Sequence, residues 1–120
     1  MHIEECYRRL GGDYAQVLQR IPSEALVKKF VIKFLEDDSF RALSRAMGED
    51  DREGAFRGSH TLKGVCANLG FERLRASASD LTELLRKTDT IPAEAEALME
   101  LVRRDYEVTI AAIQDLAATE

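Results

Sequence analysis

Apolar residues recur every three to four positions along almost the whole chain of 120 residues. This spacing places them on one face of an α-helix. No segment shows the strict alternation of apolar and polar residues that is typical of a half-buried strand. Only two prolines occur in the chain, so few helices are forced to end. The pattern therefore predicts an all-α protein.

Capping residues and glycines divide the pattern into helices. Two short N-terminal helices are expected, one over residues 2–10 and one that begins after a cap at Asp13, and we expect them to form a lid. A long helix follows the cap at Ser23, and a short connecting helix ends at Gly48. The long helix carries an apolar stripe, and we expect its members Phe30, Val31, Phe34 and Leu35 to lie in the core. The full stripe consists of Leu26, Val27, Phe30, Val31, Phe34 and Leu35.

Three further long helices complete the expected fold. Asp51 and Gly70 mark the two ends of the first, residues 71–87 form the second, and Pro92 lies in the first turn of the third. The connections are short, which favours antiparallel neighbours. We therefore expect a single domain, residues 1–120, folded as an antiparallel up-down-up-down four-helix bundle with short N-terminal and connecting helices.

Composition excludes several classes of protein. The net charge of −5 argues against a general affinity for nucleic acid. No apolar run approaches the ~20 residues that span a bilayer, and residues 1–5 do not resemble the start of a leader peptide. Cys6 and Cys66 fit no metal-ligand spacing, and they are interpreted as free thiols, although a disulfide between them stays open. We expect a cytoplasmic monomer that binds no metal, cofactor or membrane.

His60 lies on the polar side of its helix. On a helical wheel it falls opposite an arc of small and apolar residues that should face the core. Gly58, within this arc, is interpreted as a packing residue, and Gly70 as a helix stop. The arc consists of Ala55, Gly58, Ser59, Leu62, Val65, Cys66 and Leu69. His60 is therefore a candidate for a reactive side chain.

The neighbours of His60 favour phosphoryl chemistry. An exposed histidine is largely neutral at cytoplasmic pH and offers a nitrogen lone pair. Lys63 one turn later could neutralise a phosphoryl group, whereas Arg57 one turn earlier is better explained as a solvated cation. Gly64 costs roughly 1 kcal/mol of helix stability relative to alanine, and open space beside the imidazole would explain it. The three residues predict a phosphoacceptor site.

The stretch His60-Thr61-Leu62-Lys63-Gly64, with Asn68-Leu69-Gly70 after it, resembles the signature of histidine-containing phosphotransfer (HPt) domains. The helical layout resembles a free-standing bacterial-type member. The resemblance implies that His60 accepts a phosphoryl group from a receiver-domain aspartate and passes it to another receiver. It also implies that Lys63 neutralises the phosphate and Gly64 gives access. Response-regulator receivers and hybrid histidine kinases would be the partners, and the receiver would hold the Mg²⁺.

The chain departs from the family pattern at two places. Ser59 stands where alanine is frequent, and Leu81-Thr82-Glu83 replaces a Leu-Glu pair. Neither residue takes part in the expected chemistry. The chain would be a stoichiometric phosphocarrier, without an ATP site of its own, and not an enzyme.

Other functions fit the sequence less well. A bundle that docks signalling partners without phosphorylation is the main alternative. A hydrolase that pairs His60 with Cys66 is disfavoured because the two side chains lie ~240° apart on the helix. Phe56 could belong to the core under the N-terminal lid or to an exposed docking patch, and the part that Arg57 and Asn68 take in docking stays open.

Overall fold

The structure is a computed structural model that describes residues 1–119; Glu120, the last residue of the expected domain, lies outside the described residues. Within that range all regular secondary structure is helical, which confirms the all-α prediction. No helix in this range is long and apolar enough to cross a membrane. In chain order the elements are α1 (Ile3–Leu10), α2 (Tyr14–Arg20), α3 (Glu24–Lys33), the 3-10 turn η1 (Phe34–Glu36), α4 (Ser39–Gly48), α5 (Arg52–Leu69), α6 (Glu72–Arg86) and α7 (Glu94–Ala118).

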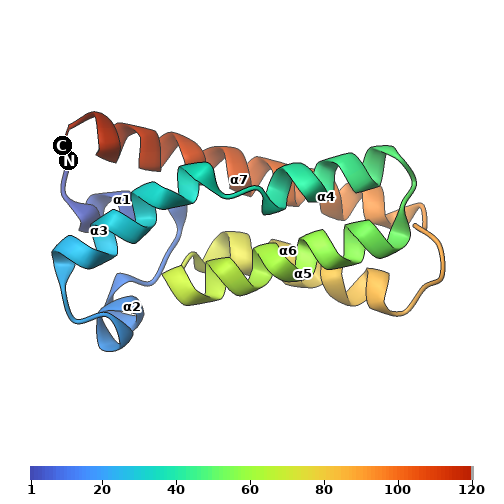
Figure 1. Ribbon diagram of the computed structural model, residues 1–120, viewed down its shortest axis with the longest axis horizontal. Coiled ribbons are helices and arrows are strands. Elements are labelled where there is room, and N and C mark those ends of the chain that lie inside the picture. The colour runs from blue at the N-terminus through green and yellow to red at the C-terminus, as the bar shows by residue number, and fades with distance from the viewer. Residues whose placement is uncertain (120) are drawn as a thin grey trace.

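The long helices form the expected up-down-up-down bundle (Figure 1). α3, η1 and α4 follow one another along one edge, and α5 runs back beside α4. α6 packs antiparallel to α5, and α7 returns along α6 to the end where the chain begins. There the amino group of Met1 donates a hydrogen bond to Thr119 Oγ1 over 3.1 Å.

One edge of the bundle is divided differently from the prediction. The helix after Ser23 was expected to be a full bundle helix, but it ends at Lys33, and α4 packs more extensively on α5 than α3 does. Gly58 explains the close packing of α4 on α5, because a Cβ added there would lie 2.9 Å from Leu43 Cα. The packing role predicted for Gly58 is confirmed.

Local capping sets the ends of the helices as the sequence predicted. The side chains of Asp13, Ser23 and Asp51 each accept a hydrogen bond from a backbone N–H in the first turn of the next helix, over 3.0, 3.2 and 3.0 Å. Gly11 and Gly70 end α1 and α5 in the left-handed conformation, with φ of 75° and 70°. Pro92, expected in the first turn of the last helix, instead lies just before α7, and its carbonyl accepts a hydrogen bond from Ala95 N over 3.0 Å.

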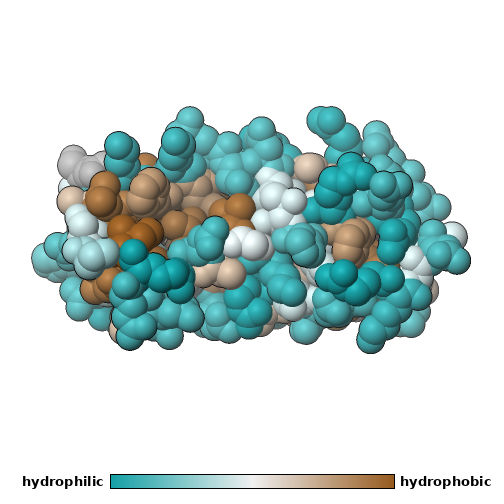
Figure 2. Space-filling view, turned by 60° about the horizontal axis from the view of Figure 1, so that its bottom comes forward, coloured by the Kyte–Doolittle hydropathy of each residue, from teal (hydrophilic) through white to brown (hydrophobic). Residues whose placement is uncertain are grey.

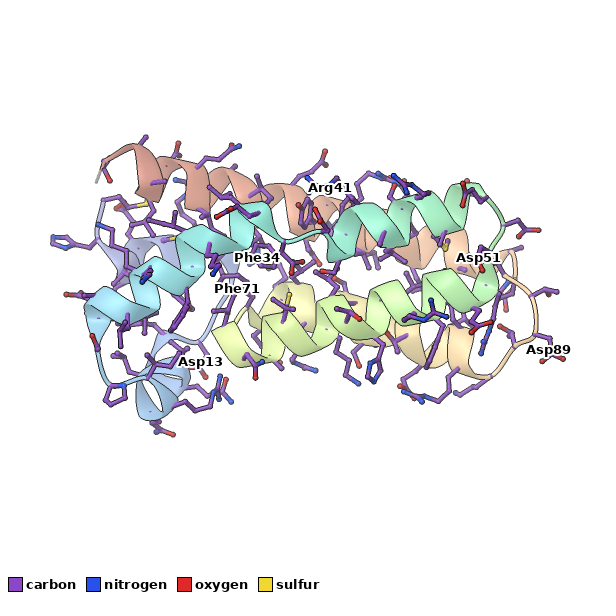
Figure 3. The ribbon with its side chains drawn as sticks, viewed as in Figure 1. Asp13, Phe34, Arg41, Asp51, Phe71 and Asp89 are labelled. Atoms are coloured by element: carbon purple, nitrogen blue, oxygen red, sulfur yellow. The ribbon has the colours of Figure 1, made fainter. Side chains whose placement is uncertain are left out.

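The N-terminal segment is joined to the turn between α5 and α6. Tyr7 donates from its buried hydroxyl to the carbonyl of Leu69 over 2.5 Å, and Asp13 N donates to the carbonyl of Gly70 over 2.8 Å. Arg20 on α2 donates to the last carbonyls of α5. Nearby, the rings of Phe34 and Phe71 meet edge-on with centroids 5.2 Å apart (Figure 3). These contacts make the expected lid a part of the bundle end and fix the C-terminal turns of α5.

The apolar arc of α5 faces the core as predicted. Leu62 and Cys66 are completely buried, and the arc leaves only Val65 partly exposed. The residues of the arc that are buried are Ala55, Gly58, Ser59, Leu62, Cys66 and Leu69. The opposite side of the helix, which carries His60, faces outward.

The prediction that Phe30, Val31, Phe34 and Leu35 all lie in the core is wrong, because Phe30 is exposed and Leu35 is only half-buried. Val27, Val31 and Phe34 are buried, but Leu26 and Phe30 are 46% and 40% exposed. α3 lies at the end of the bundle and packs on α7, α2 and the last turns of α5, which do not cover its whole apolar side. A half-covered helix at a bundle end exposes side chains that a central helix would bury.

Candidate functional site

His60 projects from the middle of α5, and its side chain is exposed. Within residues 1–119 neither ring nitrogen takes part in a hydrogen bond or an ion pair. Its one ring contact in that range is with Phe56, whose centroid lies 5.9 Å away at an interplanar angle of 35°. The nitrogen lone pair is therefore available to a reaction partner that comes from solvent.

Lys63 lies one turn after His60 and is half-buried. Its ammonium group makes no ion pair with any of the described residues. Arg57, one turn before His60, is instead paired with Glu53 over 2.9 Å, and both side chains are largely exposed. Of these two cations beside the imidazole, Lys63 is therefore the one that makes no ion pair with the described residues, and its role at a phosphoryl group stays a prediction.

Gly64 follows Lys63 on the open side of the helix. A Cβ added to Gly64 would meet no atom within 4 Å outside its own helical turn. No neighbouring element therefore requires a glycine here, in contrast to Gly58. The position leaves one flank of the imidazole open to an approaching molecule.

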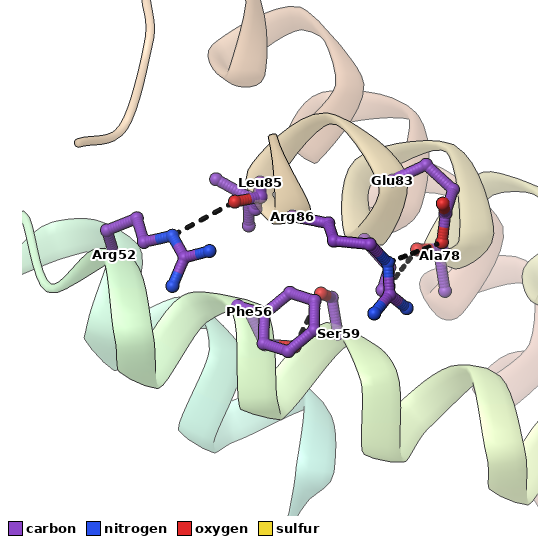
Figure 4. A network of polar contacts seen from close by, with 8 residues as sticks. Arg52, Phe56, Ser59, Ala78, Glu83, Leu85 and Arg86 are labelled. Carbon is purple, nitrogen blue, oxygen red and sulfur yellow. Dashed lines mark hydrogen bonds and ion pairs between the residues drawn. The ribbon is translucent and has the colours of Figure 1, made fainter. Parts of the chain in front are cut away.

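Phe56 borders the other flank and lies between two guanidinium groups (Figure 4). The guanidinium carbons of Arg52 and Arg86 lie 5.2 and 5.0 Å from the centroid of its ring. Arg52 Nε donates to the carbonyl of Leu85 over 2.9 Å, and Arg86 Nε is 3.3 Å from Glu83 Oε2. Phe56 is half-buried and packs against the core in the first half of α5, whereas the N-terminal segment contacts the last turn of α5. The interpretation of Phe56 as core under the N-terminal lid is therefore wrong in its position, and its part in a docking patch stays a prediction.

A shallow groove opens beyond Gly64, between α3 and the C-terminal turns of α5. Phe30, Val65 and Asn68 contribute to its lining, together with Ile21 from the segment after α2. Brown, apolar surface gathers over this end of the molecule (Figure 2). Lys33, Glu36 and Asp37 place charges of both signs in the same groove.

Cys66 does not form a catalytic pair with His60. Its thiol is completely buried, and burial raises its pKa well above the ordinary value. Both cysteines are free thiols. No group of His, Cys, Asp and Glu side chains within residues 1–119 is arranged to hold a metal ion.

The departures from the family pattern, in α6 and at Ser59 of α5, have structural explanations. Thr82 is buried and donates from its hydroxyl to the carbonyl of Ala78 over 2.7 Å, so its polar group has a partner within α6. Glu83 is half-buried and pairs with Arg86. Ser59, just before His60, is buried and donates to the carbonyl of Phe56 over 3.0 Å.

Comparison with known proteins shows the family to which the chain belongs. The family model of the Hpt domain matches residues 31–119, about three quarters of the chain, and the chain belongs to this family. No curated protein and no solved structure matched the chain. Membership implies histidine phosphotransfer in phosphorelay signalling, in which Hpt domains are phosphocarriers rather than enzymes.

The sequence identifies His60, Lys63 and Gly64 as one candidate site, but it does not show which side chains surround Phe56. The spacing of four residues between Phe56 and His60 already predicts that the two rings share a helix face. The position of Arg86 could not be predicted in the same way, because it depends on how α6 packs on α5.

Proposed function

We propose that this chain carries a phosphoryl group in transit between receiver domains, with His60 as the phosphoacceptor. The observation that carries the proposal is an exposed imidazole whose nitrogens have no hydrogen-bond or ion-pair partner among residues 1–119. Beside it lie a lysine without an ion pair in that range and a glycine that faces open space. The partners would be response-regulator receivers and hybrid histidine kinases. The protein would act as a cytoplasmic monomer.

The transfer step balances without nucleotide or water. The lone pair of one imidazole nitrogen attacks the phosphorus of an aspartyl phosphate on the receiver. The N–P bond forms as the P–O bond breaks, and the aspartate carboxylate leaves with the electron pair. The proton on the second ring nitrogen can then pass to solvent. Attack by the carboxylate of another receiver reverses these bond changes and frees the imidazole.

Lys63 and Gly64 would assist this step in different ways. The transferred group spreads negative charge over its oxygens, and the ammonium of Lys63 would offset part of that charge. The space at Gly64 would let the loops around the receiver aspartate approach the imidazole for in-line transfer. The Mg²⁺ that the reaction needs would be held by the receiver, so this chain would supply no metal ligands.

The test is phosphoryl transfer from a labelled receiver. The protein is mixed with a receiver domain that carries ³²P on its aspartate, and acid-labile, alkali-stable label on this chain is measured. Transfer to the wild type and none to His60→Gln is expected. No label on the wild type from any of a panel of receivers would favour the adaptor that docks partners without phosphorylation.

The unfolding free energy of His60→Gln shows whether the variant folds like the wild type. Because His60 is exposed and makes no hydrogen bond within residues 1–119, its replacement should leave the unfolding free energy within about 0.5 kcal/mol of wild type. Label on this variant equal to that on the wild type would place the phosphoacceptor elsewhere and refute the proposal.

A further inference from the structure

Phe56 makes the one ring contact of the His60 imidazole within residues 1–119. The torsion that rotates an imidazole about its bond to Cβ has a broad minimum, so an unsupported ring samples many orientations. At 5.9 Å between centroids and a tilt of 35°, the two rings lie within the range of a favourable aromatic pair. Within residues 1–119 the imidazole makes no hydrogen bond, ion pair or second ring contact that would restrain it.

Phe56 is itself held from both sides. The guanidinium groups of Arg52 and Arg86 lie near its ring at 5.2 and 5.0 Å, within the distance of a cation–π contact. Both arginines are tied to α6: Arg52 to the carbonyl of Leu85, and Arg86 to the carboxylate of Glu83. The ring that touches His60 is therefore fixed relative to two helices and not to α5 alone.

The hydrogen bonds of Arg52 and Arg86 distinguish these two cations from Lys63. Arg52 and Arg86 are already hydrogen-bonded within the protein, whereas Lys63 makes no ion pair with the described residues. The arginines are thus engaged in holding Phe56, and Lys63 remains available for the phosphoryl group. Phe56 is half-buried, so its ring packs against the core on one side and lies near two guanidinium groups and His60 on the other.

We infer that Phe56 is a positioning residue, which holds the His60 imidazole in the orientation needed for transfer, and that Arg52 and Arg86 clamp it in place. The inference rests on the proposed function, because it gives Phe56 a part in phosphoryl transfer through His60. Loss of the ring would leave the nucleophile chemically intact but free to turn away from the phosphorus.

The test compares Phe56→Leu, which keeps an apolar side chain, with Phe56→Tyr, which keeps the aromatic ring. Single-turnover transfer from a phosphorylated receiver is measured over a range of receiver concentrations, which separates the rate constant at saturation from receiver affinity. Phe56→Leu should lower the saturated rate about three- to tenfold, with receiver affinity unchanged. Phe56→Tyr should restore it.

NMR gives an independent measurement that needs no receiver. The ring protons of His60 should be displaced by the ring current of Phe56 in the wild type and in Phe56→Tyr, and should move toward free-histidine positions in Phe56→Leu. Arg52→Met removes one side of the clamp far from the reacting nitrogen and should change both the shifts and the rate in the same direction as Phe56→Leu. This second variant tests the clamp if Phe56→Leu folds poorly.

Distinct results would overturn the inference. A wild-type saturated rate in Phe56→Leu, or a loss that comes only from weaker receiver binding, would show that Phe56 does not position the imidazole. Unchanged shifts and rate in Arg52→Met would refute the clamp. In both cases the absence of label on His60→Gln would still support His60 as phosphoacceptor, whereas label on that variant would refute the proposed function itself.

Discussion

Gly58 and Gly64 lie on the same helix but meet opposite surroundings. A Cβ on Gly58 would lie 2.9 Å from Leu43 Cα, whereas one on Gly64 would meet nothing within 4 Å. The first glycine is required by the packing of α4 on α5. The second lowers helix stability, and no neighbouring helix requires a glycine there. We therefore propose that Gly64 leaves room for the receiver domain beside His60.

Replacement of Gly58 by alanine should destabilise the protein. The added methyl group would overlap backbone atoms of α4, which cannot rotate away as a flexible side chain could, so the two helices must separate slightly. Overpacking of this kind costs about 1–3 kcal/mol. Urea unfolding followed by circular dichroism measures the loss. A variant as stable as wild type would show that α4 and α5 can move apart without cost.

Replacement of Gly64 by alanine should have the opposite effect, with a gain of about 0.5–1 kcal/mol, because the helix gains propensity and nothing is displaced. Gly64→Leu should also fold, but its longer side chain would fill the space beside His60 and slow transfer from a phosphorylated receiver. Parallel unfolding and transfer measurements on both variants check this. Undiminished transfer by Gly64→Leu would refute the access role.

Local chemistry made much of the fold predictable. Side-chain caps at Asp13, Ser23 and Asp51, and a glycine in left-handed conformation at Gly70, depend on residues a few positions apart. The outward direction of His60 follows from the helical period alone. These features are confirmed because each is decided within one or two helical turns.

Features that depend on two helices at once were not predictable. The exposure of Phe30 depends on how little of α3 the neighbouring helices cover. The position of Arg86 over Phe56 depends on the register of α6 against α5. A helical wheel shows which way a side chain points, but it does not show what the next helix places there.

Lys63→Ala should accept phosphate about fivefold more slowly, or hold it less stably, because one exposed charge-assisted contact to the phosphoryl group is lost. Stability should stay within about 0.5 kcal/mol, because the ammonium makes no ion pair within residues 1–119. Arg57→Ala is the matched control, since that cation is already paired with Glu53. Equal transfer rates for Lys63→Ala and wild type would make Lys63 an ordinary surface lysine.

Tyr7→Phe should weaken the attachment of α1 to the bundle. The hydroxyl is buried and donates to the carbonyl of Leu69 over 2.5 Å, so its removal leaves a carbonyl at the end of α5 without that donor. The expected loss is about 1–3 kcal/mol in urea unfolding. Tyr14→Phe is the control, because the Tyr14 hydroxyl makes no hydrogen bond to the described residues. Equal stabilities of the two variants would contradict the assignment.

Alkaline pH should destabilise the protein through Cys6. Its side chain is completely buried, and burial raises the pKa of the thiol from the ordinary 9.0 to about 11, although the positive charge of Arg9 lowers it in part. Above about pH 9 the unfolded chain loses this proton while the folded protein keeps it, so the stabilising contribution is complete below the unfolded pKa and disappears as the pH rises through the folded one. Urea unfolding at a series of pH values from 8 to 11 should therefore show a steeper decline for wild type than for Cys6→Ala, which has no thiol at this position. A constant difference between the two proteins across that range would show that Cys6 does not titrate differently on folding.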